Sequence, residues 1–87
     1  MDRNEVNQTV KELICKVTGL EIEEIGDTDS FRDDMELDSL ALIEIGVEVD
    51  YAYKLRLSED EMATLRKVDE AVDLVLKKMA EKESTAT

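Results

Sequence analysis

The sequence has no histidine, no proline and no tryptophan, and it contains only one cysteine and three glycines in 87 residues. Without an imidazole, a Ser-His-Asp triad and a histidine-ligated zinc site are both excluded. A single cysteine excludes an internal disulfide and a thiolate metal cluster. No apolar run approaches the roughly 18 residues of a membrane-spanning helix, and no signal-peptide pattern opens the chain. We therefore expect a soluble, cytoplasmic protein that is not an enzyme.

Charge of one sign dominates what is present. The chain has 23 acidic and 11 basic residues, for a net charge of −12. Such a chain repels phosphate backbones and anionic lipids, so we expect it to bind neither nucleic acid nor membrane. Hydrophobic residues make up 43% of the chain, which is enough for one modest core in a domain of this length. The scarcity of proline and glycine favours helices, and the sequence predicts one monomeric all-α domain.

The first half of the chain predicts a helix followed by a long loop. An Asp2-x-x-Glu5 capping pattern opens the helix, and Gly19 is suited to end it. Residues 20–37 show no regular period, but an irregular connection of this length in a compact domain is usually functional or tied down. We therefore expect an ordered loop, held by five apolar anchors: Leu20, Ile22, Ile25, Phe31 and Met35.

Three more helices are predicted in the second half, one of them short. Asp38 is expected to cap a helix that runs to Tyr53, and Ser58-x-x-Glu61 is a capping box for the short helix. The last helix is expected from about Val68 to Lys78. The fold class is thus a small bundle of three longer helices and one short one. We divide it into a domain over residues 1–80 and a flexible tail over residues 81–87.

Helical spacing places two apolar stripes on the helix that follows Asp38. Leu42, Ile45, Val49 and Tyr53 form one stripe, which is expected to face the core. The second stripe, on nearly the opposite side, is formed by Leu40, Val47 and Tyr51 and flanked by Glu44, Glu48 and Asp50. An apolar strip framed by acids is typical of a transient interface with a basic partner. The alternative is that Val47 and Tyr51 cover the long loop.

Ser39 is the residue that suggests chemistry. It stands at the first turn of a helix, where unpaired N–H groups and positive partial charge favour a phosphate ester. A serine at a helix start is more often part of a cap than a modification site, so the tripeptide Asp-Ser-Leu alone is weak evidence for modification. The context strengthens them, because the second apolar stripe begins at Leu40, the next residue.

Three other features have plain explanations. The acids of the long loop resemble the start of an EF-hand, but Phe31 takes a ligand position and Arg32 replaces the required glycine, so we expect no metal site. Cys15 is expected to be an exposed, reduced thiol. Gly46 is expected to mark close packing between helices, with an open space between the helices as the alternative.

The chain resembles the acyl carrier protein family over nearly all of its length. The resemblance rests on the spacing from Gly19-Leu20 through Asp29-Ser30-Phe31 to Leu37-Asp38-Ser39-Leu40, and on three later segments. These are Ile43-Glu44, Leu57-Ser58-Glu59-Asp60 and Val68-Asp69-Glu70-Ala71-Val72. One departure is Glu36, which stands where the family commonly has a glycine two residues before the aspartate.

The resemblance implies that Ser39 receives 4′-phosphopantetheine from coenzyme A, through a separate phosphopantetheinyl transferase. The arm would hold acyl intermediates as thioesters for the acyltransferases, ketosynthases and other enzymes of fatty-acid, polyketide or related biosynthesis. Asp38 would help to bind the magnesium of the transferase. Partner enzymes would meet Leu40, Glu44, Val47 and Asp50.

Two alternatives remain open at this level. A peptidyl or aminoacyl carrier would have a similar fold and serine, although the acidic second helix favours an acyl carrier. A small acidic helical adaptor without a prosthetic group would explain the charge and the second stripe, but it would leave the placement of Asp-Ser-Leu as a coincidence.

Overall fold

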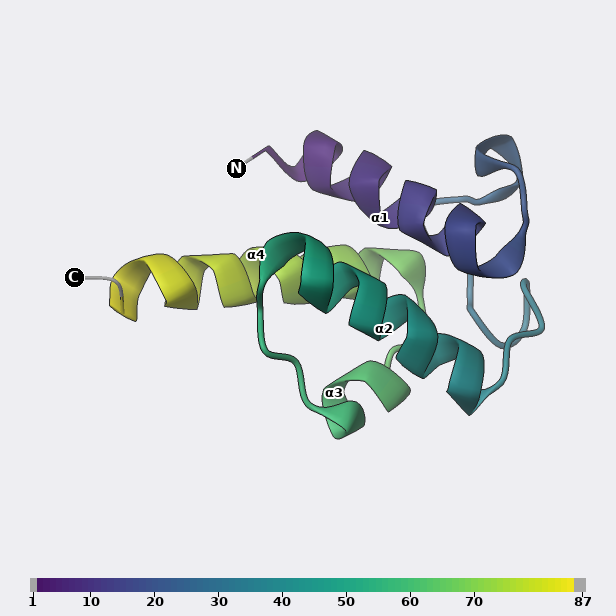
Figure 1. Cartoon of the computed structure of the whole chain (residues 1–87). Helices are drawn as coiled ribbons and strands as arrows, with labels where there is room; N and C mark the ends of the chain where they lie inside the picture. The colour runs from purple at the N-terminus through teal and green to yellow at the C-terminus, as the bar shows by residue number, and fades with distance from the viewer. Residues whose placement is uncertain (1, 86–87) are drawn as a thin grey trace.

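The computed structural model describes residues 2–85, and its side chains through residue 82. Four α-helices and one 3-10 turn make up the regular structure of this range: α1 (Arg3–Thr18), η1 (Ile22–Glu24), α2 (Ser39–Tyr53), α3 (Glu59–Ala63) and α4 (Val68–Thr85). In Figure 1, α1, α2 and α4 form the body of the bundle, and the short α3 packs beside α2. The predicted all-α fold of three longer helices and one short helix is confirmed.

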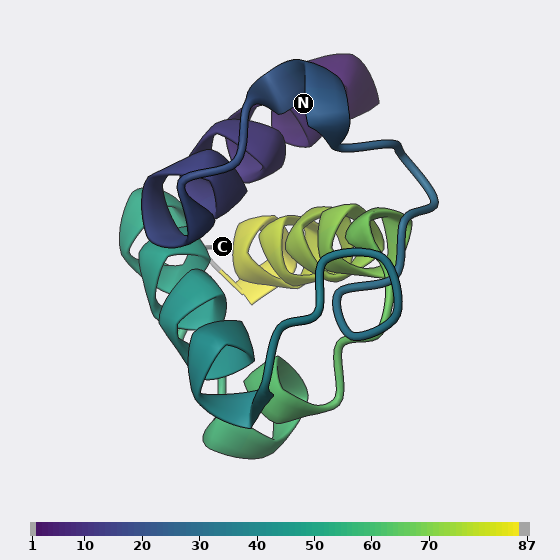
Figure 2. The same ribbon diagram turned by 90° about the vertical axis from the view of Figure 1, so that its right-hand side faces the viewer.

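The core lies where the three longer helices face one another, as the end-on view of Figure 2 shows. Each longer helix contributes fully buried aliphatic side chains at helical spacing: Val6, Val10 and Ile14 from α1, Leu42 and Ile45 from α2, and Val68, Val72 and Val75 from α4. Phe31 is the largest of the fully buried side chains, and it comes from the loop. The predicted inward stripe of α2 is therefore confirmed.

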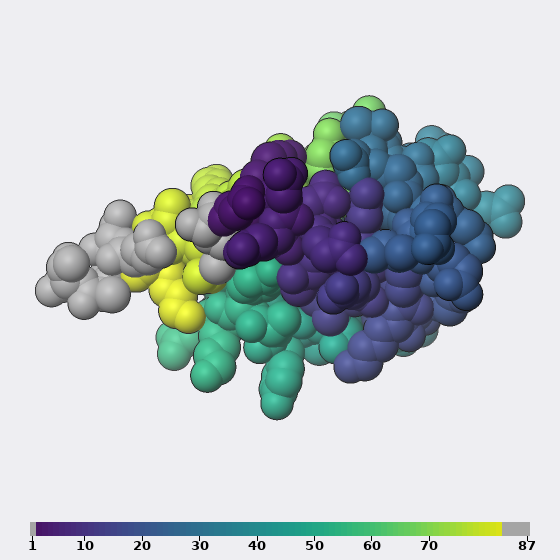
Figure 3. All heavy atoms as spheres, turned by 90° about the horizontal axis from the view of Figure 1, so that it is seen from above, coloured from purple at the N-terminus to yellow at the C-terminus, as the bar shows by residue number. Residues whose placement is uncertain are grey.

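Local signals set the ends of α1. The Asp2 carboxylate accepts a hydrogen bond from the Asn4 amide at 3.0 Å, and Gly19 closes the helix in the left-handed conformation at φ +79°. Both boundaries agree with the capping pattern in the sequence. From above, α1 lies across the bundle, and the loop gathers at one end of it (Figure 3).

The long loop is ordered because it is bonded to the start of α4. The Phe31 amide donates to the Arg66 carbonyl oxygen at 2.8 Å, and the Val68 amide donates to the Asp29 carbonyl oxygen at 3.0 Å. Ile25 is buried together with Phe31, as expected of anchors. The 3-10 turn η1 was not predicted, since three residues are too few to show a period.

The connection to α3 is close-packed. The Ser58 hydroxyl accepts from the Glu61 amide at 3.1 Å while the Glu61 carboxylate accepts from the Ser58 amide at 3.0 Å, which confirms the capping box. Gly46 of α2 is buried against α3, where an added Cβ would lie 2.7 Å from the Cβ of Met62. The close-packing explanation of Gly46 is therefore the correct one.

Two expectations require correction. The helix α4 continues to Thr85, beyond the predicted end at Lys78, because no glycine or proline interrupts a run of good helix formers. Cys15 is half-buried against the edge of the core rather than exposed. Its burial, with Glu21 and Glu23 nearby, raises the pKa of the thiol and keeps it protonated.

The domain of residues 1–80 and the tail of residues 81–87 stay a prediction. Residues 86 and 87, at the end of that tail, lie outside the residues that the structure describes.

Candidate functional site

The first turn of α2 separates the role of Asp38 from that of Ser39. Asp38 has an extended backbone, and its Oδ1 accepts from the Ala41 amide at 2.9 Å. The Asp38 carbonyl oxygen accepts from the Leu42 amide at 3.1 Å. Asp38 is thus the N-cap of the helix, and Ser39 is its first residue. Since the cap is already supplied, the Ser39 hydroxyl is not required for it.

Arg32 is the partner of the Ser39 hydroxyl. The guanidinium Nη2 of Arg32, in the loop, donates to the Ser39 Oγ at 2.8 Å, and both residues are exposed. The sequence analysis did not find this contact. The sequence does single out Arg32, because it is the only basic residue between Lys16 and Lys54.

The backbone turns sharply just before this site. Glu36, at the position where the family commonly has a glycine, has φ +55°. This left-handed conformation favours glycine, and a residue with a side chain holds it only when its surroundings fix it. Here the next amide, of Leu37, donates to the Phe31 carbonyl oxygen at 2.8 Å. The turn delivers the chain to Asp38 with the backbone extended.

The second stripe of α2 is open. Leu40 is 66% exposed, Val47 51% and Tyr51 84%. The alternative, in which Val47 and Tyr51 cover the loop, is therefore wrong. Large apolar side chains that are exposed along one face of a helix are available for contact with a partner.

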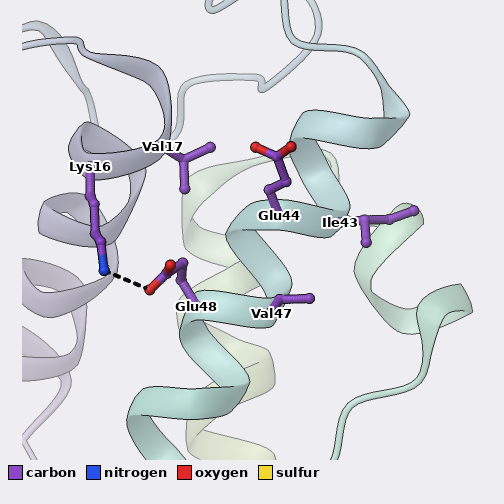
Figure 4. A pocket seen from close by; sticks show the side chains of 6 residues that line it. All are labelled: Lys16, Val17, Ile43, Glu44, Val47 and Glu48. Carbon is purple, nitrogen blue, oxygen red and sulfur yellow. Dashed lines mark hydrogen bonds and ion pairs between the residues drawn. The ribbon is translucent and has the colours of Figure 1, made fainter.

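A shallow groove of about 410 Å³ separates α1 from α2 beside this stripe, lined by Lys16, Val17, Ile43, Glu44, Val47 and Glu48. In Figure 4, Glu48 reaches across the groove toward Lys16, whereas Val47 projects away from α1. The Lys16 ammonium and the Glu48 carboxylate form an ion pair at 3.1 Å. Of the two glutamates in the groove, Glu44 is exposed and Glu48 is tied to α1.

Asp50 has different surroundings from those expected of a residue that flanks the open stripe. Its Oδ1 accepts from the amides of Leu55 and Arg56 at 3.1 and 2.8 Å, and its Oδ2 accepts from the Leu57 amide at 3.1 Å. The carboxylate therefore holds the connection between α2 and α3. The sequence gives no sign of this, because Asp50 and its donors meet only when the chain turns back after α2.

Neither a metal centre nor a membrane span emerges from the described part of the chain. Within residues 2–85, no three cysteine or acidic side chains gather closely enough to hold a metal ion. In the same range, every helix is too short or too polar to cross a bilayer.

The comparisons with known proteins agree with this geometry. Residues 8–75 match the family profile described as "Phosphopantetheine attachment site". The chain is 36% identical over 76 residues to a protein of Rubrobacter xylanophilus named "Acyl carrier protein", covering 87% of this chain and 94% of that one. The chain belongs to the acyl carrier protein family. Its prosthetic group is accordingly 4′-phosphopantetheine, and proteins of this family are carriers rather than catalysts, which interact with acyl-processing enzymes.

The chain is also similar to one further acyl carrier protein in sequence and to two in structure. The chain is 35% identical over 75 residues to the "Meromycolate extension acyl carrier protein" of Mycobacterium leprae, covering 86% of this chain and 65% of that one. The crystal structure of an acyl carrier protein from Thermotoga maritima matches with a TM-score of 0.78 and 25% identity, over 93% and 94% of the two chains. A doublet acyl carrier protein from prodigiosin biosynthesis, 24% identical, shares the fold with a TM-score of 0.74, over 85% of this chain and 36% of that one.

Proposed function

We propose that Ser39 is the residue to which 4′-phosphopantetheine is attached. One observation carries the proposal: Asp38 supplies the helix cap, so the exposed Ser39 hydroxyl is left for other chemistry. Ser58, at the start of α3, gives the contrast within the same chain. There the hydroxyl accepts from the Glu61 amide and is part of the cap.

The electrostatics of this position also favour a phosphodiester. The first N–H groups of a helix have no partner within the helix, and the N-terminus carries about half a positive charge. Asp38 takes up the Ala41 amide, and the Arg32 guanidinium adds a full positive charge 2.8 Å from Oγ. A phosphate bonded to Oγ is placed between these two sources of positive potential.

The attached arm ends in a thiol, which supplies the chemistry of holding an acyl group as a thioester. The protein itself exposes the serine, orients the arm at the start of α2 and catalyses nothing. We propose that a phosphopantetheinyl transferase loads it, and that Asp38 helps to bind the magnesium of that enzyme. The Oδ2 of Asp38 suits this role, because it accepts no hydrogen bond from the described residues while Oδ1 holds the cap.

The open stripe of α2 is the surface that we propose for partner enzymes, with Leu40, Val47 and Tyr51 as apolar contacts and Glu44 as the steering charge. Glu48 and Asp50 were also predicted as partner contacts. The Glu48 carboxylate is paired with Lys16, and the Asp50 carboxylate accepts from backbone amides, so we propose that both contribute less than Glu44 to the binding of partners. We further propose that the partners include acyltransferases, ketosynthases and other acyl-processing enzymes. The same proposal places the protein in the cytoplasm as a monomer.

Intact-mass spectrometry after incubation with coenzyme A and a transferase tests the attachment. We expect the mass of the native chain to rise by one phosphopantetheinyl group, and Ser39→Ala to show no rise. Ser30→Ala is the matched control, since Ser30 lies in the neighbouring loop and its hydroxyl only accepts from the Asp33 amide. Loading of the Ser39→Ala protein, or failure of the native chain to load, would overturn the proposal.

A further inference from the structure

Arg32 is unusual in its place in the sequence. Residues 17–53 contain no other basic residue, although this stretch includes the acidic loop and the acidic side of α2. Its guanidinium is not paired with any of these acids in the part of the chain that the structure describes. It donates instead to the neutral hydroxyl of Ser39 at 2.8 Å.

Two acidic side chains close to Arg32 in the sequence are bonded to the backbone. Asp34 Oδ2 accepts from the Ser30 amide at 2.7 Å, and Asp38 Oδ1 accepts from the Ala41 amide. These bonds hold the two carboxylates to the backbone on either side of Arg32. The guanidinium is directed at an uncharged oxygen, which is an unusual use of a cation in a chain with a net charge of −12.

Two further basic residues lie near Arg32 and add to the positive potential there. Arg32 lines a cavity of about 330 Å³ together with Arg66 and Lys67, along with Ser30, Asp33 and Glu70. Arg66 is paired with Glu70 at 3.5 Å, whereas Lys67 has no acidic group within 4.0 Å among the side chains that the structure describes. An antiparallel bridge between Ser30 and Lys67 keeps the loop beside the start of α4. With three basic and two acidic side chains, the cavity carries a small net positive charge beside the proposed attachment site.

We propose that Arg32 is the phosphate-binding residue of the loaded carrier; this rests on attachment at Ser39. When Oγ becomes an ester oxygen, the phosphorus lies one bond away, and its two non-bridging oxygens come within reach of a guanidinium that already contacts Oγ. A planar guanidinium presents two parallel N–H donors to two such oxygens, which an ammonium group does not. Loading thus replaces a bond to a neutral hydroxyl by a charge-assisted pair.

This pairing has two consequences for the arm. It offsets the negative charge that loading adds beside Asp38, where the chain already repels further anions. It also ties the first atoms of the arm to the loop, so that the arm leaves α2 in a restricted direction. Arg32 is a positioning residue in this sense, and it takes no part in bond making.

The test compares loaded and unloaded protein in four chains: native, Arg32→Gln, Arg32→Lys and Lys67→Gln. Lys67→Gln is the matched control, because it removes one positive charge from the same cavity without touching Ser39. Complete loading is verified by intact mass before each measurement, which keeps a failure of attachment distinct from a failure of this proposal. Two quantities are measured at low salt: the melting temperature, and the ³¹P resonance of the phosphodiester.

We expect the change in melting temperature on loading to be less favourable in Arg32→Gln than in the native chain by about 1–5 °C, the size expected of an exposed ion pair in a domain of this length. The ³¹P resonance should move in Arg32→Gln and less in Arg32→Lys, and it should stay in place in Lys67→Gln. High salt should remove most of the difference in melting temperature. Equal loading effects and an unchanged ³¹P resonance in Arg32→Gln would overturn the proposal.

Discussion

Gly46 and Val47 are neighbours in α2, yet they stand on sides of the helix with opposite properties. Gly46 faces α3 and is buried so closely that a methyl group in its place would overlap Met62. Val47 is half exposed at the groove beside α1. The side of α2 toward α3, here the closed side, has no room for a side chain at Gly46. The side with Leu40, Val47 and Tyr51, here the open side, presents apolar surface to solvent.

This difference separates stability from recognition within a single helix. On the closed side, shape decides the outcome, because an interior packed at this density has no room for an added atom. On the open side, apolar contact and charge are available to a partner without weakening the core. Substitutions on the two sides should therefore change different observables.

The largest effect should come from filling the closed side. Gly46→Ala should lower the free energy of unfolding by about 1–3 kcal/mol, since overpacking outweighs the gain of about 1 kcal/mol in helix propensity. Urea denaturation measures it. In the double variant with Met62→Ala, the two effects should be less than additive, because truncation of Met62 makes room for the new methyl group. Additive losses would show that the two residues do not compete for space.

The next test concerns the cap of α3, the helix that packs against the closed side. Ser58→Ala should cost about 1 kcal/mol, because it leaves the Glu61 amide without its acceptor. Ser39→Ala should change stability by no more than about 0.5 kcal/mol, because Asp38 and not Ser39 supplies that cap. Equal losses in urea denaturation would mean that the two hydroxyls have the same structural role.

On the open side, reversal of charge should change a rate rather than stability. Glu44→Lys should slow association with the transferase several-fold at low ionic strength, and the effect should fade near 0.15 M salt, where the screening length is about 8 Å. Stopped-flow kinetics measure it, with Glu81→Lys as a control of equal charge at the far end of α4. Leu40→Ala should weaken binding at every salt concentration. Loading kinetics that Glu44→Lys leaves unchanged at low salt would remove Glu44 from the docking surface.

The smallest effect concerns pH. Two contacts hold the pKa of Glu61 below its ordinary value. The larger effect comes from the hydrogen bond that the Ser58 amide donates to the carboxylate, and the second comes from the Lys78 ammonium, 2.9 Å from Oε2. A carboxyl group whose pKa is lowered in the folded state stabilises it above the pKa of the unfolded chain, and this contribution is lost as the pH falls through the folded value. Glu61→Gln should therefore cost less than about 1 kcal/mol at pH 7, and the cost should be smaller at pH 3. A cost that is the same at both pH values would contradict this assignment.

The features that sequence predicted correctly are those encoded within a few residues. The caps at Asp38 and Ser58 follow from short local patterns, and the open stripe follows from a period of 3.6 residues. The contact of Arg32 with Ser39, the bonds of Asp50 and the burial of Cys15 could not be predicted in this way. Each depends on how separate segments meet in the folded chain, which local pattern does not specify.

The bonds that join Phe31 to Arg66 and Asp29 to Val68 bear on the order in which the protein is made. Synthesis produces Ser39 well before Arg66, so a chain still on the ribosome that ends before the start of α4 lacks the two backbone bonds that tie the loop to that helix, although the pair of Lys11 with Asp27 can already form. The bonds from Phe31 to Arg66 and from Val68 to Asp29 close a long segment, and the entropy of that closure is overcome only once α4 has been made. The loop beside Ser39 is thus fixed late in synthesis, by contacts that only the finished fold contains.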